Sequence, residues 1–224
     1  MILNFFQMGR LYRTEDNMRA ILWCNGDLPE EKIVNNIIDE NITIFGIDGG
    51  ANKAHNLGIK VHEIIGDMDS VDTNLLTESK TELYDQSKSD LTKSLDLLIG
   101  RGFDEIDIIG VDGGSSEHIL GIWASLYEAV PGCKIRAIHR NRISVRYHPS
   151  DGDLKISMKP GTEFSIFSMG KTESVTVTGA KWNLKERELE FSTLGLHNIS
   201  IDQEICIRSN GKLIVILPNH YSSE

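Results

Sequence analysis

Cysteine and long apolar runs are the two features that this sequence has least of. Cys24, Cys133 and Cys206 are its three cysteines, and no two of them stand in a Cys-x-x-Cys spacing. An odd, scattered set predicts neither a disulfide framework nor a zinc site, and it favours a reducing compartment. No apolar run approaches the roughly 18 residues of a membrane span, and the opening MILNFFQMGR lacks the features of a signal peptide. We therefore expect a cytoplasmic protein that does not enter a membrane.

Positive charge is also in short supply. The 224 residues include 23 Lys and Arg against 33 Asp and Glu, which gives a net charge of -10 at pH 7. Binding to bare nucleic acid needs basic side chains gathered over phosphates, so this composition argues against a nucleic-acid partner. A phosphorylated substrate would need a metal ion between its phosphates and the acidic protein.

The first part of the chain alternates short apolar runs with segments of helical character. Apolar runs at 20–24, 42–47, 61–66 and 106–110 are interleaved with predicted helices at 29–41, 49–57, 89–100 and 115–130. This alternation is typical of βαβ units and predicts a Rossmann-like, mostly parallel sheet with helices on both faces. Two helices have apolar residues at helical spacing, which should face the core: Leu91, Leu95 and Leu98, then Ile119, Ile122, Trp123 and Leu126.

After Pro131 and Gly132 the helical pattern stops. From residue 133 onward, short alternating strands are separated by the turn sequences SDGD, KPGT, MGKT and SNGK, which are typical of an antiparallel β-sandwich. The predicted fold is therefore an α/β domain followed by a C-terminal antiparallel β-sandwich. We expect an N-terminal extension at 1–18, a nucleotide-binding α/β domain at 19–135, and a β-sandwich domain at 136–224.

Acidic residues follow several of the predicted parallel strands. Asp48 follows one apolar run, Asp67 and Asp69 follow the next, and Asp112 follows a third. Ligands of open parallel sheets bind beyond the carboxyl ends of the strands, so these side chains should share one rim. Several carboxylates around Mg²⁺ could attract a polyphosphate that they would otherwise repel. The glycine pairs Gly49-Gly50 and Gly113-Gly114 precede helices and leave backbone N–H groups open to an anion.

Each of these features also has a purely structural interpretation. A Gly-Asp pair at a strand end is usually only a turn, and the run from Ser87 to Asp90 can be a capping box that opens a helix. Lys93, one turn further on, is more often a solvated side chain than a phosphate ligand. The functional interpretation depends on these features occurring together, because several acid-bearing loops at strand ends of one domain are hard to explain as independent turns.

A resemblance gives this conjunction a more specific meaning. In order, seven motifs spread over nearly the whole chain resemble those of the thiamine pyrophosphokinase family: NGDLP (25–29), IDGGANKAHNLG (47–58), IIGDMDSVD (64–72), DQSKSDLTKSLDLL (85–98), GVDGGSSEHILG (110–121), GAKWNL (179–184) and GLHN (195–198). The resemblance implies transfer of a pyrophosphoryl group from ATP to the hydroxyl of thiamine, with release of AMP. It also implies a homodimer in which thiamine lies between the α/β domain of one subunit and the β-sandwich of the other.

The family's site residues can be carried over position by position. The resemblance implies metal binding, and with it catalysis, at Asp67, Asp69 and Asp90, with Asp48 close by. It implies nucleotide contacts from Asp48, Gly49, Gly50, Asn52, Gln86, Lys93, Gly113 and Gly114. It implies thiamine contacts from Gln86, Glu117, Trp182, His197 and Asn198. Trp182 would offer its ring to a cationic heterocycle, whereas Trp23 and Trp123 are assigned to packing.

Two motifs depart from the family pattern. The family usually reads Gly-Gly-Arg-x-Asp-His where this chain has GGSSEH, so Ser115 replaces a basic residue, and Glu117, which we predict to be catalytic, replaces an aspartate. The family's late Gly-x-Ser-Asn motif becomes Gly-Leu-His-Asn, which places His197 where a serine hydroxyl would be. Two other functions stay open: a metal-dependent nucleotide-sugar glycosyltransferase, and a catalytically inactive nucleotide or thiamine sensor.

Overall fold

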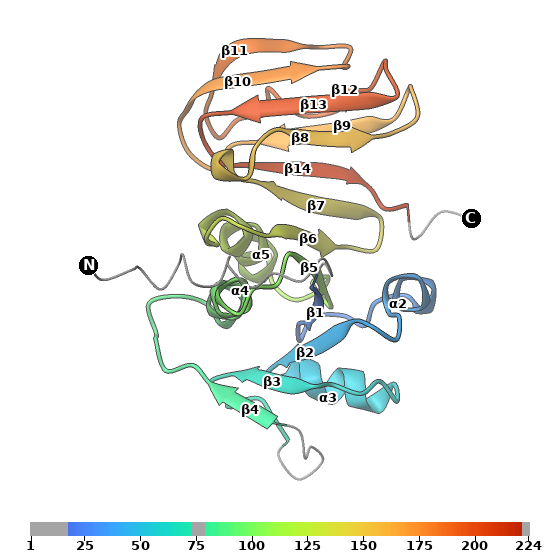
Figure 1. Ribbon diagram of the computed structural model, residues 1–224, viewed down its shortest axis with the longest axis vertical. Helices are drawn as coiled ribbons and strands as arrows, with labels where there is room; N and C mark the ends of the chain where they lie inside the picture. Colours follow the sequence, from blue (N-terminus) through green and yellow to red (C-terminus); the bar gives the residue numbers. More distant parts are fainter. Residues whose placement is uncertain (1–17, 73–78, 221–224) are drawn as a thin grey trace.

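The computed structural model describes residues 18–72 and 79–220, and its 10-stranded sheet runs along the long axis of the molecule, with a 4-stranded sheet at one end (Figure 1). The predicted extension at 1–18, apart from Met18, lies outside the described residues. No helix in the described ranges is long and apolar enough to cross a membrane.

The parallel part of the larger sheet is built from six strands. Its spatial order is β6-β5-β1-β2-β3-β4, and the strands are β1 (Arg19–Trp23), β2 (Thr43–Ile47), β3 (Glu63–Gly66), β4 (Ser79–Glu82), β5 (Glu105–Ile109) and β6 (Lys134–Ile138). The order reverses between β1 and β5, so this is the topological switch point of the sheet. The carboxyl ends of β1, β2, β3 and β5 therefore lie along one edge.

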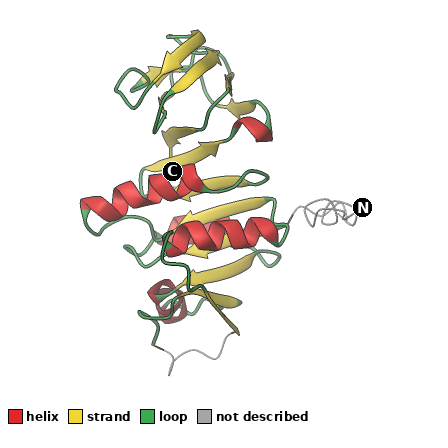
Figure 2. Cartoon of the chain, turned by 90° about the vertical axis from the view of Figure 1, so that its left-hand side faces the viewer, coloured by secondary structure: helices red, strands yellow, loops and turns green. Residues whose placement is uncertain are grey.

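Four helices cover both faces of this parallel part: α2 (Glu31–Ile37), α3 (Gly49–Asn56), α4 (Asp90–Gly100) and α5 (Ser116–Glu128). Alternate residues of β1 point to opposite faces, as the pleat requires. Ala20 and Leu22 pack in the cluster that contains α4, and Ile21 and Trp23 pack in the cluster that contains α2 and α3. Figure 2 shows α4 and α5 lying across the same face of the strands. The predicted Rossmann-like arrangement is thus confirmed.

The antiparallel part continues the same sheet. Strand β7 (Arg142–Tyr147) pairs antiparallel with β6, and the order extends through β14 (Leu213–Pro218), β9 (Glu163–Phe167) and β12 (Asn198–Ile199). A second sheet of β11 (Leu184–Leu189), β10 (Thr172–Thr178), β13 (Glu204–Ser209) and β8 (Leu154–Ser157) packs against this end. Both sheets contribute to one apolar cluster, in which Phe164, Val177 and Ile207 are buried. The predicted antiparallel sandwich is confirmed.

Three local expectations need correction. The segment 134–138, placed among the antiparallel strands, pairs parallel with β5. Helix α4 is capped by Ser89, whose Oγ accepts a hydrogen bond from the Thr92 N–H (3.2 Å), so the capping residue is not Ser87. Leu91, Leu95 and Leu98 are buried as expected, but on α5 Ile119 remains 40% exposed. The domain boundary at 135/136 stays a prediction, and it falls inside β6.

Candidate active site

Three carboxylates from different segments meet at the carboxyl edge of the parallel strands. Asp48 follows β2, Asp67 follows β3, and Asp90 begins α4. One oxygen of each lies within 4.8 Å of the others. The structure thus brings together three of the four acids that the sequence analysis assigned to a metal site.

Asp48 is the most constrained of the three. It adopts a positive φ of 45°, and its Oδ1 accepts a hydrogen bond from the Met68 N–H at 3.1 Å. The Asp48 carboxylate also lies so close to Gly66 that a Cβ there would collide with it, which explains the glycine at this position. Burial, and then the negative charges of Asp90, Asp67 and Asp69, raise the pKa of Asp48 to about 6.

Asp67 and Asp69 both occupy the turn after β3, but only Asp67 belongs to the group of three carboxylates. Asp67 Oδ1 accepts a hydrogen bond from the Asp69 N–H at 3.2 Å, which fixes the turn. Asp69 is exposed, its Oδ1 accepts from the Ser70 hydroxyl at 2.7 Å, and it lies outside the group of three. Asp69 is nevertheless close enough to contribute to the raised pKa of Asp48.

Lys93 supports Asp90 from inside the fold. Its ammonium lies 2.8 Å from Asp90 Oδ1 and donates a hydrogen bond to the Leu83 carbonyl at 3.0 Å. The side chain is only 8% exposed. The sequence analysis weighed a phosphate ligand against a solvated side chain, and the structure shows a third arrangement, in which Lys93 holds Asp90 in place.

The chemistry of this donor group fits a hard divalent cation. Mg²⁺ binds oxygen ligands and usually retains waters and substrate phosphates. The three carboxylates lie close together, and Lys93 pairs with one of them, Asp90. Their mutual repulsion contributes to the raised pKa of Asp48, and a bound cation would relieve it. Asp48, Asp67 and Asp90 are the residues that would hold the ion.

The glycine pair after Asp48 lets the start of α3 approach the loop after β1. A Cβ at Gly50 would collide with the Trp23 carbonyl, and one at Gly49 would lie 2.5 Å from the Asn25 amide nitrogen. Asn52 accepts a hydrogen bond from the Asp72 N–H at 3.2 Å and so supports the turn after β3, and its nucleotide contact stays a prediction.

Sequence reasoning missed Lys53, which lies between these loops. Its ammonium donates to the Asn25 carbonyl at 2.8 Å and to the Gly26 carbonyl. The lysine belongs to the quoted DGGANK segment, one helical turn after the glycine pair, and that spacing is the signal that could have drawn attention to it. Lys53 ties the loop after β1 to α3.

The turn after β5 carries a second set of predicted residues. Gly113 and Gly114 both have a positive φ, of 78° and 77°. Ser115 precedes α5, and Glu117 is exposed in its first turn. A hydrogen bond from the Ser115 hydroxyl, and then one from the Glu117 backbone N–H, lower the pKa of Glu117. Gln86 is exposed in the segment between β4 and α4.

The residues predicted to contact thiamine in the β-sandwich lie together, away from the acids. Asn198 is buried, and its side chain accepts from the Trp182 N–H (3.2 Å) and donates to the Trp182 carbonyl (2.9 Å). The Trp182 ring is exposed, with the Lys181 ammonium 4.6 Å from its centroid. His197 has a φ of 56°, and its Nδ1 lies 2.9 Å from Glu163 Oε1.

Within one chain, these two groups of predicted residues belong to opposite ends. Strands β2 and β3, which precede the carboxylates, lie at one end of the long axis, and β10, β11 and β12 lie at the other (Figure 1). One subunit therefore does not bring its own Trp182 to its own carboxylates.

Comparisons with known proteins agree with this division of features. A family model described as the catalytic domain of thiamin pyrophosphokinase matches residues 34–137. A second model, described as the vitamin B1 binding domain of the same enzyme, matches residues 153–214. Together the two models match well over half of the chain.

Individual relatives point the same way. Thiamine pyrophosphokinase of Bacillus subtilis (strain 168) is 29% identical over 170 residues, which are 71% of this chain and 79% of the relative. The crystal structure of thiamine pyrophosphokinase from Bacillus subtilis has a TM-score of 0.73 at 25% identity and covers 91% of this chain and 99% of that one. Thiamin pyrophosphokinase from Candida albicans, at 16% identity, shares the fold, with a TM-score of 0.71 over 90% of each chain. The chain belongs to the thiamine pyrophosphokinase family and is therefore a transferase.

Proposed function

We propose that this protein transfers a pyrophosphoryl group from ATP to the hydroxyl of thiamine in a Mg²⁺-dependent reaction, giving thiamine diphosphate and AMP. The observation that carries the proposal is the convergence of Asp48, Asp67 and Asp90 at the carboxyl edge of the sheet. This edge is where open α/β sheets bind nucleotides. The same reaction is the one that the family resemblance implies.

Pyrophosphoryl transfer needs position and charge neutralisation more than covalent help from the protein. When bound, Mg²⁺ would neutralise phosphate charge. Asp48, Asp67 and Asp90 would hold the ion, and exposed Asp69 would contact it directly or through a water molecule. Lys93 keeps Asp90 in place, and Lys53 positions the loop after β1 beside the start of α3. The N–H groups near Gly49, Gly50, Gly113 and Gly114 would contact the phosphates.

Glu117 and Gln86 would act on the acceptor. A carboxylate whose pKa is lowered stays ionised at neutral pH, so Glu117 can accept a hydrogen bond from the thiamine hydroxyl and orient it. Gln86, exposed beside the start of α4, can donate to the substrate. Both side chains are exposed, and the predicted thiamine residues of the same chain lie at its other end. Thiamine held by a β-sandwich would therefore have to come from a second subunit.

A homodimer with a composite site would satisfy that requirement. Trp182, His197 and Asn198 of one subunit would face the carboxylates and Glu117 of the other. In this arrangement 19–135 serves as the nucleotide-binding part and 136–224 as the thiamine-binding part. The free thiols Cys24 and Cys133, both buried, fit the expected reducing cytoplasm.

Product analysis tests the proposal directly. The full chain is incubated with ATP, Mg²⁺ and thiamine, and the products are separated by chromatography. We expect thiamine diphosphate and AMP in equal amounts. Formation of ADP, or phosphorylation of thiamine monophosphate alone, would contradict pyrophosphoryl transfer. Binding of both substrates without any product would favour the sensor, and activity only with a nucleotide sugar would favour the glycosyltransferase.

A further inference from the structure

A cavity of about 1100 Å³ lies where the parallel strands give way to the β-sandwich, in the middle of Figure 1. Residues of β6, β7 and the end of β14 line one side of it, and the whole of β8 lines the other. Val145 of β7 lines the cavity, whereas the adjacent Ser144 accepts a hydrogen bond from Trp123 of α5. Alternate residues of a strand point to opposite faces, so the cavity and α5 lie on opposite faces of the sheet. None of the carboxylates of the candidate active site lines it.

Strand β8 leaves one of its edges unpaired. It ends the order β11-β10-β13-β8, and within the described ranges its only neighbouring strand is β13. The Met158 N–H donates to the Gln203 carbonyl at 3.0 Å, and along an antiparallel pair the residues that bond to the partner strand alternate. Ile156 therefore bonds to β13, and the N–H and C=O groups of Lys155 and Ser157 point away from it. Such an edge is a template for another extended chain.

The surface beside this edge is apolar. Four side chains at the margin of the sandwich core are only partly buried and line the cavity: Val145, Ile156, Met158 and Leu217. Every second side chain of a strand added beside β8 would point to the same face as Ile156 and could be buried on this surface. Backbone pairing along an edge, with apolar contacts for alternate side chains, is a recurrent way of recognising extended peptides.

The charged groups of the cavity leave an excess of positive charge. Each of its three aspartates accepts a hydrogen bond or forms an ion pair with another described residue: Asp104, Asp151 and Asp153. By contrast, Lys134, Lys155 and Lys159 are exposed and form no side-chain hydrogen bond or salt bridge with any residue in the described ranges. In a chain whose net charge is -10, three such lysines around one cavity favour an acidic partner.

We infer that this cavity binds an extended acidic segment of another protein, which pairs with the unpaired edge of β8 and adds a strand to the 4-stranded sheet. Alternate apolar side chains of that segment would lie on Val145 and Met158. Its acidic side chains would meet Lys155 across the strand pair. The inference does not depend on the proposed transfer reaction, because the cavity contains none of the residues assigned to that reaction.

Two synthetic octapeptides with blocked ends test the inference. One alternates glutamate and valine, and the other alternates lysine and valine. Fluorescence anisotropy of the labelled peptides measures their binding to the full chain. Lys155→Glu reverses the charge at the edge, and its matched control is Lys185→Glu, an exposed lysine on β11, the opposite edge strand of the same sheet. Ser157→Pro removes an outward N–H, and its control Ser157→Ala retains that N–H.

We expect the acidic peptide to bind at one site per chain and the basic peptide not to bind. Lys155→Glu and Ser157→Pro should each weaken the acidic peptide at least tenfold, while both controls bind it as the unmodified chain does. Lys155→Glu should also bind the basic peptide better than the unmodified chain does. In hydrogen exchange followed by NMR, the bound acidic peptide should slow exchange of the Ser157 N–H, whereas the Ile156 N–H, already bonded to β13, should change little.

The inference is overturned if neither peptide binds, if both bind alike, or if the acidic peptide binds both variants as it binds the unmodified chain. It is also overturned if Ser157→Pro dissociates an assembly of the unmodified chain in sedimentation, because a second copy would then occupy the edge. Binding of decanoate without binding of the acidic peptide would assign the cavity to a small amphipathic anion instead.

Melting temperatures are measured for every variant. Lys155→Glu changes only an exposed side chain, so it decides the outcome if Ser157→Pro unfolds the protein. A chain that fails the peptide tests can still form thiamine diphosphate, and one that passes them can be inactive. The outcome is therefore separate from that of the product assay.

Discussion

At the scale of single residues, the ionised carboxylate of Asp48 carries an electrostatic cost. Burial and three neighbouring carboxylates raise its pKa to about 6, so the folded protein binds a proton there that the unfolded chain releases near pH 3.8. Such a group favours folding at low pH, and this stabilisation is lost as pH rises through about 6. A bound cation would remove the cost, because it replaces the proton.

Asp48→Asn tests this in the absence of divalent metal. The unmodified chain should lose up to about 3 kcal/mol of unfolding free energy between pH 4 and pH 7 from this group, and the variant should lack that loss. Asparagine retains the oxygen that accepts from the Met68 N–H. Denaturant titrations at several pH values measure the effect, with exposed Asp202→Asn as the control. Equal pH slopes in all three proteins would show that Asp48 has an ordinary pKa.

Glu117 is one of the residues at which the chain departs from the motifs that it resembles, together with Ser115 and His197. As a helix-start residue alone it would contribute about 0.3–1 kcal/mol of stability and nothing to the rate. As the group that orients the thiamine hydroxyl, it should matter in the transition state.

Glu117→Gln separates these roles because it keeps the size and removes the charge. We expect kcat to fall at least about tenfold, a barrier change of about 1.4 kcal/mol, with the melting temperature nearly unchanged. Steady-state kinetics and a thermal melt on the same preparation provide both readouts. An unchanged kcat with a lower melting temperature would leave Glu117 as a helix-start residue only.

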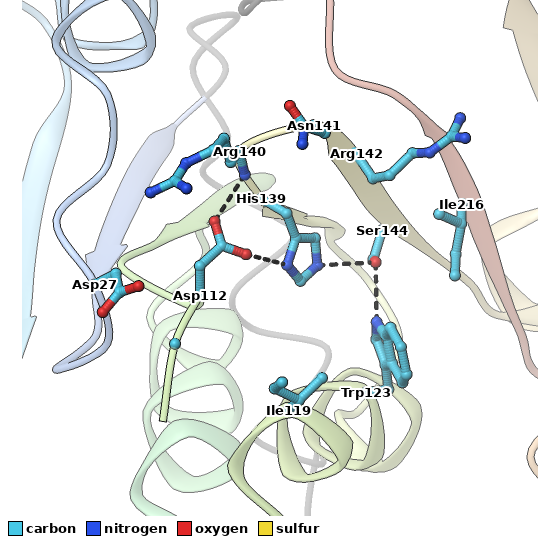
Figure 3. A pocket seen from close by; sticks show the side chains of 11 residues that line it. Asp27, Asp112, Ile119, Trp123, His139, Arg140, Asn141, Arg142, Ser144 and Ile216 are labelled. Carbon is cyan, nitrogen blue, oxygen red and sulfur yellow. Dashed lines mark hydrogen bonds and ion pairs between the residues drawn. The ribbon is translucent and has the colours of Figure 1, made fainter. Parts of the chain in front are cut away.

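At the scale of elements, a series of hydrogen bonds runs from Trp123 through Ser144 and His139 to Asp112 (Figure 3). It joins α5, β7 and the loops after β5 and β6. Partial burial opposes the ionised form of Asp112, but hydrogen bonds from His139 and the Arg140 N–H outweigh it and lower the pKa of Asp112. The contribution of this carboxylate to stability is therefore present above its unfolded pKa of about 3.9 and lost as pH falls through the lower folded value.

His139→Ala should remove the central member of this series of hydrogen bonds. We expect a loss of about 1–3 kcal/mol of unfolding free energy at pH 7, because Asp112 and Ser144 both lose a partner. The loss should begin to shrink below about pH 3.9, where the unfolded chain binds a proton at Asp112, and should be smallest once the pH has fallen through the lower folded pKa. The control is His118→Ala, whose ring makes only a 3.5 Å contact with Ser115. A loss that is independent of pH would indicate packing alone.

The elements also show what sequence patterns can and cannot predict. Buried runs such as those of β1 and β5 are strongly apolar, and the acids that follow such runs meet because parallel strands end at one edge. Strand β4 was missed because Ser79–Glu82 is polar and mostly exposed at the sheet edge, so it carries no apolar signal. The parallel partner of β6 and the link from His139 to Asp112 depend on contacts distant in sequence, which local periodicity does not encode.

At the scale of the whole molecule, the separation of Trp182 from the carboxylates is the feature on which the proposed dimer rests. The two groups belong to opposite ends of one chain (Figure 1), so a site that uses both must be shared between subunits. A twofold dimer would then contain two equivalent shared sites.

Mixing two inactive variants tests this arrangement. Asp67→Asn damages the α/β side of both sites of its homodimer, and Trp182→Ala damages the β-sandwich side. In a heterodimer of the two, one site receives both damaged sides and the other receives none. Equal mixing with subunit exchange should make about half of the dimers heterodimers and restore about a quarter of the unmodified activity.

The matched control is a mixture of Asp67→Asn with Asp90→Asn, two acids of the same cluster. Both changes lie on the α/β side, so every site in the heterodimer contains one damaged carboxylate and no activity should return. Recovery in the first mixture alone would establish that the site is shared. If neither mixture recovers although a tagged-subunit assay shows that heterodimers form, Trp182 and Asp67 do not serve a common site across the interface, and the residues around Trp182 must act within their own subunit or outside catalysis.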